Sequence, residues 1–162
     1  MPTAPLFDER PPFDRGKLAG ALRRLAGEGI WIGTSSWKYE GWLGQVYSRE
    51  RYMSRGVFAQ KRFEAACLEE YARTFPAVCG DFTFYQFPSE AYWRRLFQSA
   101  PEQLVFAFKA PEQITAKVFP SHARYGPRGG LVNTSFLDVE LFKEQFLALL
   151  ESLAAADAFR LR

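Results

Sequence analysis

Residues 103–109 read QLVFAFK, and this stretch gives the clearest indication of the fold. Successive side chains of a β-strand point to opposite faces of the sheet, so Phe106 and Phe108 share one face while Ala107 and Lys109 share the other. Bulky aromatic side chains suit a face under helices, and small or polar ones suit a barrel interior or its mouth. The stretch therefore predicts a strand with helices on one side only.

The same alternation indicates a second strand over residues 77–85. Phe82 and Phe84 would lie under the helices, and Asp81, Thr83 and Tyr85 would point inward near the carboxyl end of the strand. A shorter apolar run, residues 30–34, predicts a first strand that ends at Thr34 in the equivalent place.

Helical spacing of apolar residues separates these strands. It predicts helices over residues 17–26 and 62–75, one that begins after a Ser89 cap, and one from an Asp138 cap to about residue 155. Strands that alternate with helices pair in parallel through right-handed crossovers, so we expect an α/β fold. Long loops over 36–60 and 110–137 follow strands, and catalytic groups of parallel α/β folds sit in such loops.

The composition is that of one globular domain. The chain has 162 residues, of which 48% are hydrophobic and 24% charged, and aromatic residues reach 17%. We interpret residues 1–15, which are rich in proline, as a flexible extension, and residues 16–162 as a single domain. No apolar stretch approaches the roughly 20 residues of a membrane span, and the proline-rich start is not a signal peptide.

The net charge and the absence of known binding motifs exclude several classes of partner. A net charge of +3 with scattered basic residues does not favour nucleic acid. The single histidine argues against a metal site, and the chain has no glycine loop of a phosphate- or dinucleotide-binding type, so we expect neither metal nor cofactor. Two cysteines are too few for a disulfide framework, which favours a cytoplasmic protein. Without a membrane-spanning stretch, we expect no membrane partner.

Asp81 and Lys109 are the candidate catalytic residues, because both would point inward from adjacent strands. Lys109 would anchor an anionic substrate group or transfer a proton, poised by Asp81. The alternative is an ion pair with a purely structural role.

Candidate substrate-binding residues surround this pair. Trp37, Tyr39 and Trp42 would form a stacking platform for a sugar or base, or else fold back and plug the mouth of a barrel. His122 and Arg124, in the second long loop, would contact an anion or simply lie at the surface. The remaining candidates follow the strands: Thr34, Tyr85 and Thr115.

Three segments resemble the domain of unknown function 72 (YecE-like) family. They are residues 33–42, residues 83–89 and residues 108–115, and they occur in the family's order within residues 30–150. The resemblance implies a TIM-type barrel, and it leaves the reaction open. Members commonly carry a glutamate and an asparagine where this chain has Cys79 and Asp81, and a histidine where it has Ala116.

Length distinguishes two functional hypotheses. A barrel of this type needs about 250 residues, so we expect this chain to form only about its first three strand–helix units. The first hypothesis is a protein that binds or acts on a small polar or anionic ligand at the strand ends. The second is a non-catalytic remnant, or one piece of a split barrel, that associates with itself or with a complementary chain.

Overall fold

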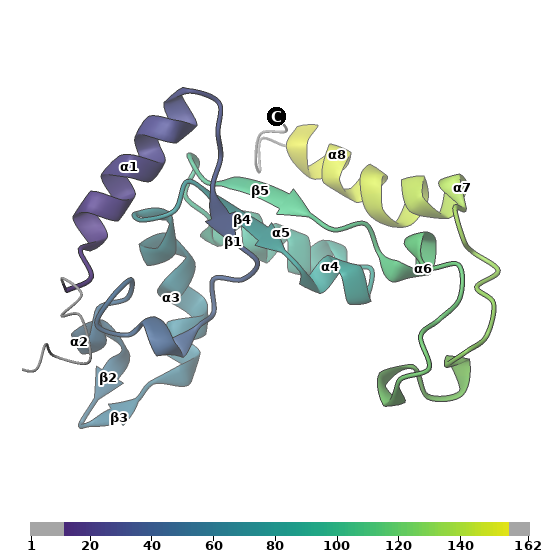
Figure 1. The fold of residues 1–162 in the computed structure, drawn as a ribbon, viewed down its shortest axis with the longest axis horizontal. Helices are drawn as coiled ribbons and strands as arrows, with labels where there is room; N and C mark the ends of the chain where they lie inside the picture. The colour runs from purple at the N-terminus through teal and green to yellow at the C-terminus, as the bar shows by residue number, and fades with distance from the viewer. Residues whose placement is uncertain (1–11, 156–162) are drawn as a thin grey trace, which may run out of the picture.

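The computed structural model describes residues 12–155, in which helices and strands alternate (Figure 1). The helical elements are α1 (Arg15–Gly27), η1 (Glu40–Trp42), α2 (Arg49–Tyr52), α3 (Gln60–Ala72), α4 (Phe82–Tyr85), α5 (Glu90–Ser99), α6 (Glu112–Thr115), η2 (Ala123–Arg128), α7 (Val139–Phe142), the π-helical η3 (Lys143–Leu147) and α8 (Ala148–Ala155). The strands are β1 (Gly33–Thr34), β2 (Met53–Ser54), β3 (Val57–Phe58), β4 (Ala77–Gly80) and β5 (Val105–Phe108).

The central sheet has three strands in the order β1-β4-β5, and both of its pairings are parallel. The predicted α/β class with parallel strands is therefore confirmed. Gly33 pairs with Ala77, and a Cβ at Gly33 would lie 1.9 Å from the Ala77 carbonyl oxygen. Only glycine permits this close approach of β1 to β4.

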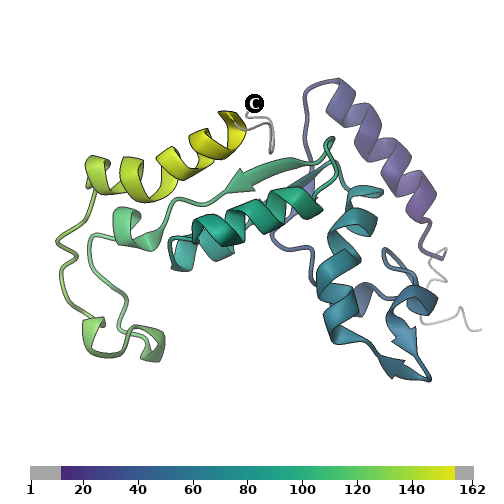
Figure 2. The ribbon, with the colours of Figure 1, turned by 180° about the vertical axis from the view of Figure 1, so that it is seen from behind.

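Aromatic side chains cover one face of the sheet, on the side of α5. Phe106 packs edge-on against Phe97, and Phe108 packs edge-on against Trp93 with ring centroids 4.7 Å apart. Helix α5 runs behind the sheet in Figure 1 and in front of it in Figure 2. The alternation predicted for residues 104–109 thus matches the packing of Phe106 and Phe108.

The other face of the sheet carries small side chains. Cys79 pairs with Ala107 across β4 and β5, and Ala77 pairs with Val105. Ala107 is exposed, and the other three are partly exposed. We call these four residues the open face.

The predicted second strand is too long. It ends at Gly80, and residues 82–85 form the short helix α4. The Thr83 hydroxyl is buried and shares its proton between the carbonyl oxygens of Gly80 and Lys109, at 2.9 and 2.6 Å. These tertiary bonds stabilise the turn, so the inward strand positions predicted for Thr83 and Tyr85 were wrong.

Other boundaries also differ from the prediction. The first strand comprises only Gly33 and Thr34, and the helix predicted over 62–75 ends at Ala72. The segment predicted as a loop over 36–60 contains α2 and the antiparallel hairpin β2–β3, and the one over 110–137 contains α6 and η2. The caps at Ser89 and Asp138 are confirmed, because their side chains accept the amides of Tyr92 and Leu141.

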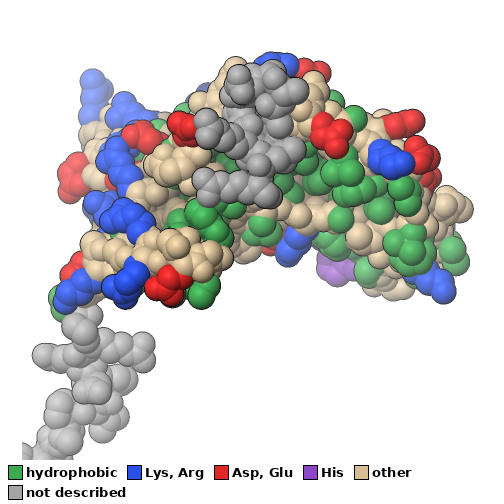
Figure 3. All heavy atoms as spheres, turned by 90° about the horizontal axis from the view of Figure 1, so that it is seen from above, with side chains coloured by type: hydrophobic (Ala, Val, Ile, Leu, Met, Phe, Trp, Pro, Cys, Tyr) green, Lys and Arg blue, Asp and Glu red, His purple; other side chains and the backbone are tan. Residues whose placement is uncertain are grey.

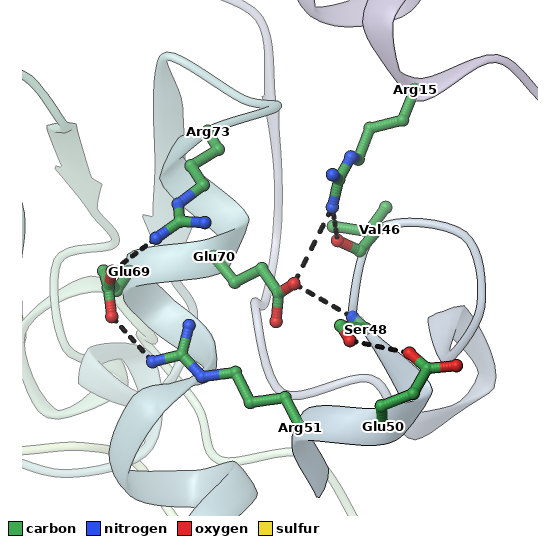
Figure 4. Close-up of polar contacts among 8 residues, drawn as sticks. All are labelled: Arg15, Val46, Ser48, Glu50, Arg51, Glu69, Glu70 and Arg73. Carbon is green, nitrogen blue, oxygen red and sulfur yellow. Dashed lines mark hydrogen bonds and ion pairs between the residues drawn. The ribbon is translucent and has the colours of Figure 1, made fainter.

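A buried carboxylate, Glu70 of α3, joins the start of the described chain to its core (Figure 4). One of its oxygens accepts the Ser48 amide at 2.9 Å and lies 3.7 Å from the Arg15 guanidinium. Arg15 also donates to the Val46 carbonyl oxygen at 3.0 Å. We call Arg15, Val46, Ser48 and Glu70 the Glu70 clamp.

Helix α1 begins at Arg15, with the Asp14 carboxylate as its cap, so the predicted extension over 1–15 overlaps this helix. Residues 1–11 lie outside the described part of the chain. Within residues 12–155, no helix is long and apolar enough to cross a membrane.

Candidate functional site

Asp81 and Lys109 meet at the carboxyl ends of β4 and β5. Gly80 pairs with Phe108, so the residues that follow them are neighbours at the edge of the sheet. The Lys109 Nζ lies 2.9 Å from the Asp81 Oδ1. The side chains are 53% and 32% exposed, so solvent or a ligand reaches both. The structure joins the two residues, and their catalytic role stays a prediction.

The charge states at this pair follow from its hydrogen bonds. The hydrogen bond to Asp81 raises the pKa of Lys109 above its usual range, so the ammonium remains charged at neutral pH. The Cys79 thiol lies 3.5 Å from the same carboxylate, and burial raises the pKa of this thiol. Cys79 is therefore a protonated thiol at neutral pH and a poor nucleophile.

Arg124 from the second long loop reaches the same edge. Its guanidinium lies 4.4 Å from the centroid of the Tyr85 ring, and Tyr85 belongs to α4, which begins directly after Asp81. Arg124 also donates to the Glu112 Oε2 at 3.1 Å, and the Tyr125 hydroxyl donates to the same oxygen at 2.7 Å. Glu112 is buried, and its carboxylate holds the Arg124 guanidinium through this hydrogen bond.

These residues form one arrangement of paired charges, which we call the strand-end cluster: Asp81, Tyr85, Lys109, Glu112 and Arg124. Its two cations are about half exposed, whereas the Glu112 side chain is 4% exposed. A lysine ammonium has three donors, and Asp81 is its one hydrogen-bond partner within residues 12–155. The cluster therefore presents positive charge outward, which suits an anionic group of a ligand.

Three of the predicted binding residues make local hydrogen bonds, and their role in binding stays a prediction. The Thr34 hydroxyl bonds Ser36 and the buried Tyr71, which also bridges to Ala77 of β4. The Thr115 hydroxyl bonds the Pro111 carbonyl oxygen within α6. The His122 Nδ1 accepts the Arg124 amide at 3.1 Å and caps η2.

The aromatic loop packs onto the core. Trp37 is buried, accepts the Tyr47 hydroxyl at its carbonyl oxygen and meets Phe82 edge-on. The Trp42 ring stacks on Phe75, which precedes β4. The Tyr39 ring is exposed and packs edge-on against the Trp42 ring. Trp37 and Trp42 thus pack against aromatic rings of this chain, and the role of the loop in stacking on a ligand stays a prediction.

Sequence reasoning missed Glu112 and Tyr125 as site residues. A signal for Glu112 is its position directly after the third strand, where α6 begins. Tyr125 had no such signal, because its place depends on the path of the loop that precedes η2. The described residues contain no group of three or more His, Cys, Asp or Glu that could hold a metal ion.

An α/β protein with a charged cluster at the carboxyl ends of parallel strands is the class that this geometry defines. Residues 31–158 match the family model described as "Protein of unknown function DUF72", and the chain belongs to this family. Neither the curated proteins nor the solved structures contain a significant match to the chain.

Proposed function

We propose that the chain binds a small polar or anionic ligand at the strand-end cluster. The observation that carries this proposal is the half-exposed Lys109 ammonium, which Asp81 holds in place. Arg124, which contacts the Tyr85 ring of α4, adds a second half-exposed cation. Carboxylate and phosphate groups pair with such cations through charge-assisted hydrogen bonds.

The position of the cluster also supports the proposal. Ligand sites of parallel α/β folds lie beyond the carboxyl ends of the strands. Tyr85 adds an exposed ring next to Arg124, and Glu112 holds the guanidinium in place. A ligand would displace solvent from Lys109 and Arg124 without breaking a buried contact.

Calorimetric titration with inorganic phosphate tests this function. We expect saturable binding that Lys109→Ala weakens at least fivefold, because one charge-assisted bond is lost. Lys117→Ala is the matched control, since Lys117 is also an exposed lysine and lies in the loop after α6. Equal weakening by both substitutions, or no saturable heat, would contradict the proposal.

For the fold, we propose that β1, β4 and β5 are the first strands of a (β/α) barrel. The parallel order β1-β4-β5 and the helices between these strands fit such a barrel, and they fit a Rossmann-type unit equally well. The free cysteines Cys67 and Cys79 suit the reducing cytoplasm.

A second candidate function is association with another copy or with a complementary chain. The exposed Ala107 on the open face favours it, because a barrel interior is normally covered by further strands. Light scattering over a range of concentrations, with Ala107→Lys as the variant, tests it. A particle that is larger than one chain, and that Ala107→Lys reduces to a monomer, is expected. A monomer at every concentration would contradict association with another copy of the chain.

A further inference from the structure

A groove of about 690 Å³ lies between α3 and α5, on the face of the sheet opposite to the open face. Figure 2 shows the two helices side by side. Each helix contributes one stripe at i, i+3, i+4 and i+7 spacing, which places those side chains on one helical face. The lining residues are Trp37 and Lys38 from the loop after β1, Lys61, Glu64, Ala65 and Leu68 from α3, and Tyr92, Arg95, Leu96, Gln98 and Ser99 from α5.

The floor of the groove is apolar, and the groove is open because two small residues, Ala65 and Ser99, face each other across it. Trp37, Leu68 and Leu96 are buried in the hydrophobic core beneath it. Ala65 and Ser99 stand on the facing helices and leave the space between them unfilled. A volume of this size is in the range of sites for small organic ligands, roughly 300–1,000 Å³.

The rim of the groove is positively charged. Lys38, Lys61 and Arg95 contribute three cations, and none of them has an ion-pair partner among residues 12–155. Glu64 is the one carboxylate of the lining, and it accepts a hydrogen bond from Gln60 at 2.8 Å. The charge of the rim therefore favours an anion, whereas the floor favours an apolar body.

We propose that this groove is a binding site for a small amphiphilic anion, a ligand with one carboxylate, phosphate or sulfonate group on a flat apolar body. The anionic group would lie between Lys61 and Arg95, and the apolar body would cover Leu68 and Leu96. The site is separate from the strand-end cluster, because the lining residues include neither Asp81 nor Lys109 nor Arg124.

Fluorescence titration with 8-anilinonaphthalene-1-sulfonate tests the proposal, since this probe is an aromatic anion that brightens in apolar sites. We expect one saturable site. The double variant Lys61→Glu, Arg95→Glu should raise the dissociation constant about tenfold or more, because it reverses the charge of the rim. Arg24→Glu on α1, an exposed position outside the groove, should change it less than twofold.

A second pair of variants tests the groove itself. Ala65→Phe fills it from an exposed helical position and should abolish the saturable signal. Ala91→Phe adds the same ring at an exposed position of α5 outside the groove and should preserve binding. The neutral probe N-phenyl-1-naphthylamine, which has the same ring system without the sulfonate, should bind more weakly and be insensitive to the double charge reversal.

Several outcomes would overturn the proposal: unsaturable binding, equal effects of Ala65→Phe and Ala91→Phe, or a signal lost in Lys109→Ala. The last result would move the probe to the strand-end cluster. All these substitutions are at exposed positions, so we expect folded variants, and circular dichroism checks this. If the double variant loses its circular-dichroism signal, Arg95→Gln decides, and an unchanged dissociation constant for that variant contradicts the proposal.

Discussion

The Glu70 clamp and the strand-end cluster are both built on a carboxylate and a cation, yet they differ in what surrounds the charges. The Glu70 side chain is 5% exposed, and it holds a backbone amide and the α1 residue Arg15 against the core. Lys109 is 53% exposed, and Asp81 is its one ion-pair partner in the described chain. The clamp therefore joins elements, whereas the cluster leaves charge available to a ligand.

The largest expected effect concerns stability at the clamp. Glu70→Ala should lower the free energy of unfolding by about 2–4 kcal/mol, because the Ser48 amide and Arg15 lose a buried acceptor. Glu69→Ala is the control on the same helix. Glu69 is half exposed and pairs with Arg51 and Arg73 at the surface, so its loss should cost less than about 1 kcal/mol. Urea denaturation measures both values, and equal losses would refute the distinction between buried and exposed pairs.

An intermediate effect is expected beneath the cluster. Tyr125→Phe removes the 2.7 Å hydrogen bond to the buried Glu112, which should cost about 1–2 kcal/mol of unfolding free energy. Tyr39→Phe, at an exposed ring in the loop after β1, should be neutral. A neutral Tyr125→Phe in thermal or urea unfolding would mean that Glu112 does not depend on this bond.

Lys109→Ala should separate binding from stability. Its side chain is about half exposed and lies at the surface, so the unfolding midpoint should stay within error of the unmodified protein. The same substitution should weaken phosphate binding at least fivefold, as argued above. A large fall in the midpoint would assign Lys109 the structural role that we assign to Glu70.

The smallest effect is the pH dependence of anion binding. The hydrogen bond to Asp81 raises the pKa of Lys109 above the ordinary value of 10.5. A raised lysine pKa keeps the ammonium almost fully charged at pH values well below 10.5, and the charge is lost as the pH rises through the raised value. Sulfate, whose charge is constant here, should therefore bind equally well at pH 7 and pH 9. A fall in affinity between these values would contradict the raised pKa.

The sequence predicted elements whose signals are local. Ser89 and Asp138 cap helices because a short polar side chain before an apolar stripe satisfies free amides. The hairpin β2–β3 was missed, although Arg55 and Gly56 have positive φ angles of 50° and 79° and form its turn. Glycine at the second turn position was the available signal.

The alternation of side chains along the strands predicted only the site residues that directly follow a strand. Lys109 follows β5 directly, so its neighbour Asp81 could be inferred from parallel pairing. Residues 82–85 alternate like a strand, but the bonds of Thr83 to two carbonyl oxygens turn them into a helix. The contact of Arg124 with Tyr85 depends on the path of the loop over residues 116–137, and no local sequence pattern predicts such a path.

Several apolar side chains are exposed between η2 and the start of α7. Seen from above, hydrophobic side chains gather toward the end of the molecule that carries α7 (Figure 3). The exposed apolar residues of this region are Leu131, Val132, Phe136, Leu137 and Val139. Such surface is typical of contacts with other molecules, and it lies in the segment that leads from η2 to α7.

Nuclear magnetic resonance titration with inorganic phosphate shows whether the strand-end cluster is the ligand site. The amides of residues 109, 110, 112 and 113 and of residues 80–85 should shift in a saturable way, while those of residues 46–48 beside Glu70 stay fixed. In Lys109→Ala the shifts at the strand ends should shrink at equal phosphate concentration. Unmoved strand-end amides, or shifts of the same size in Lys109→Ala, would contradict the assignment of the strand-end cluster as the ligand site.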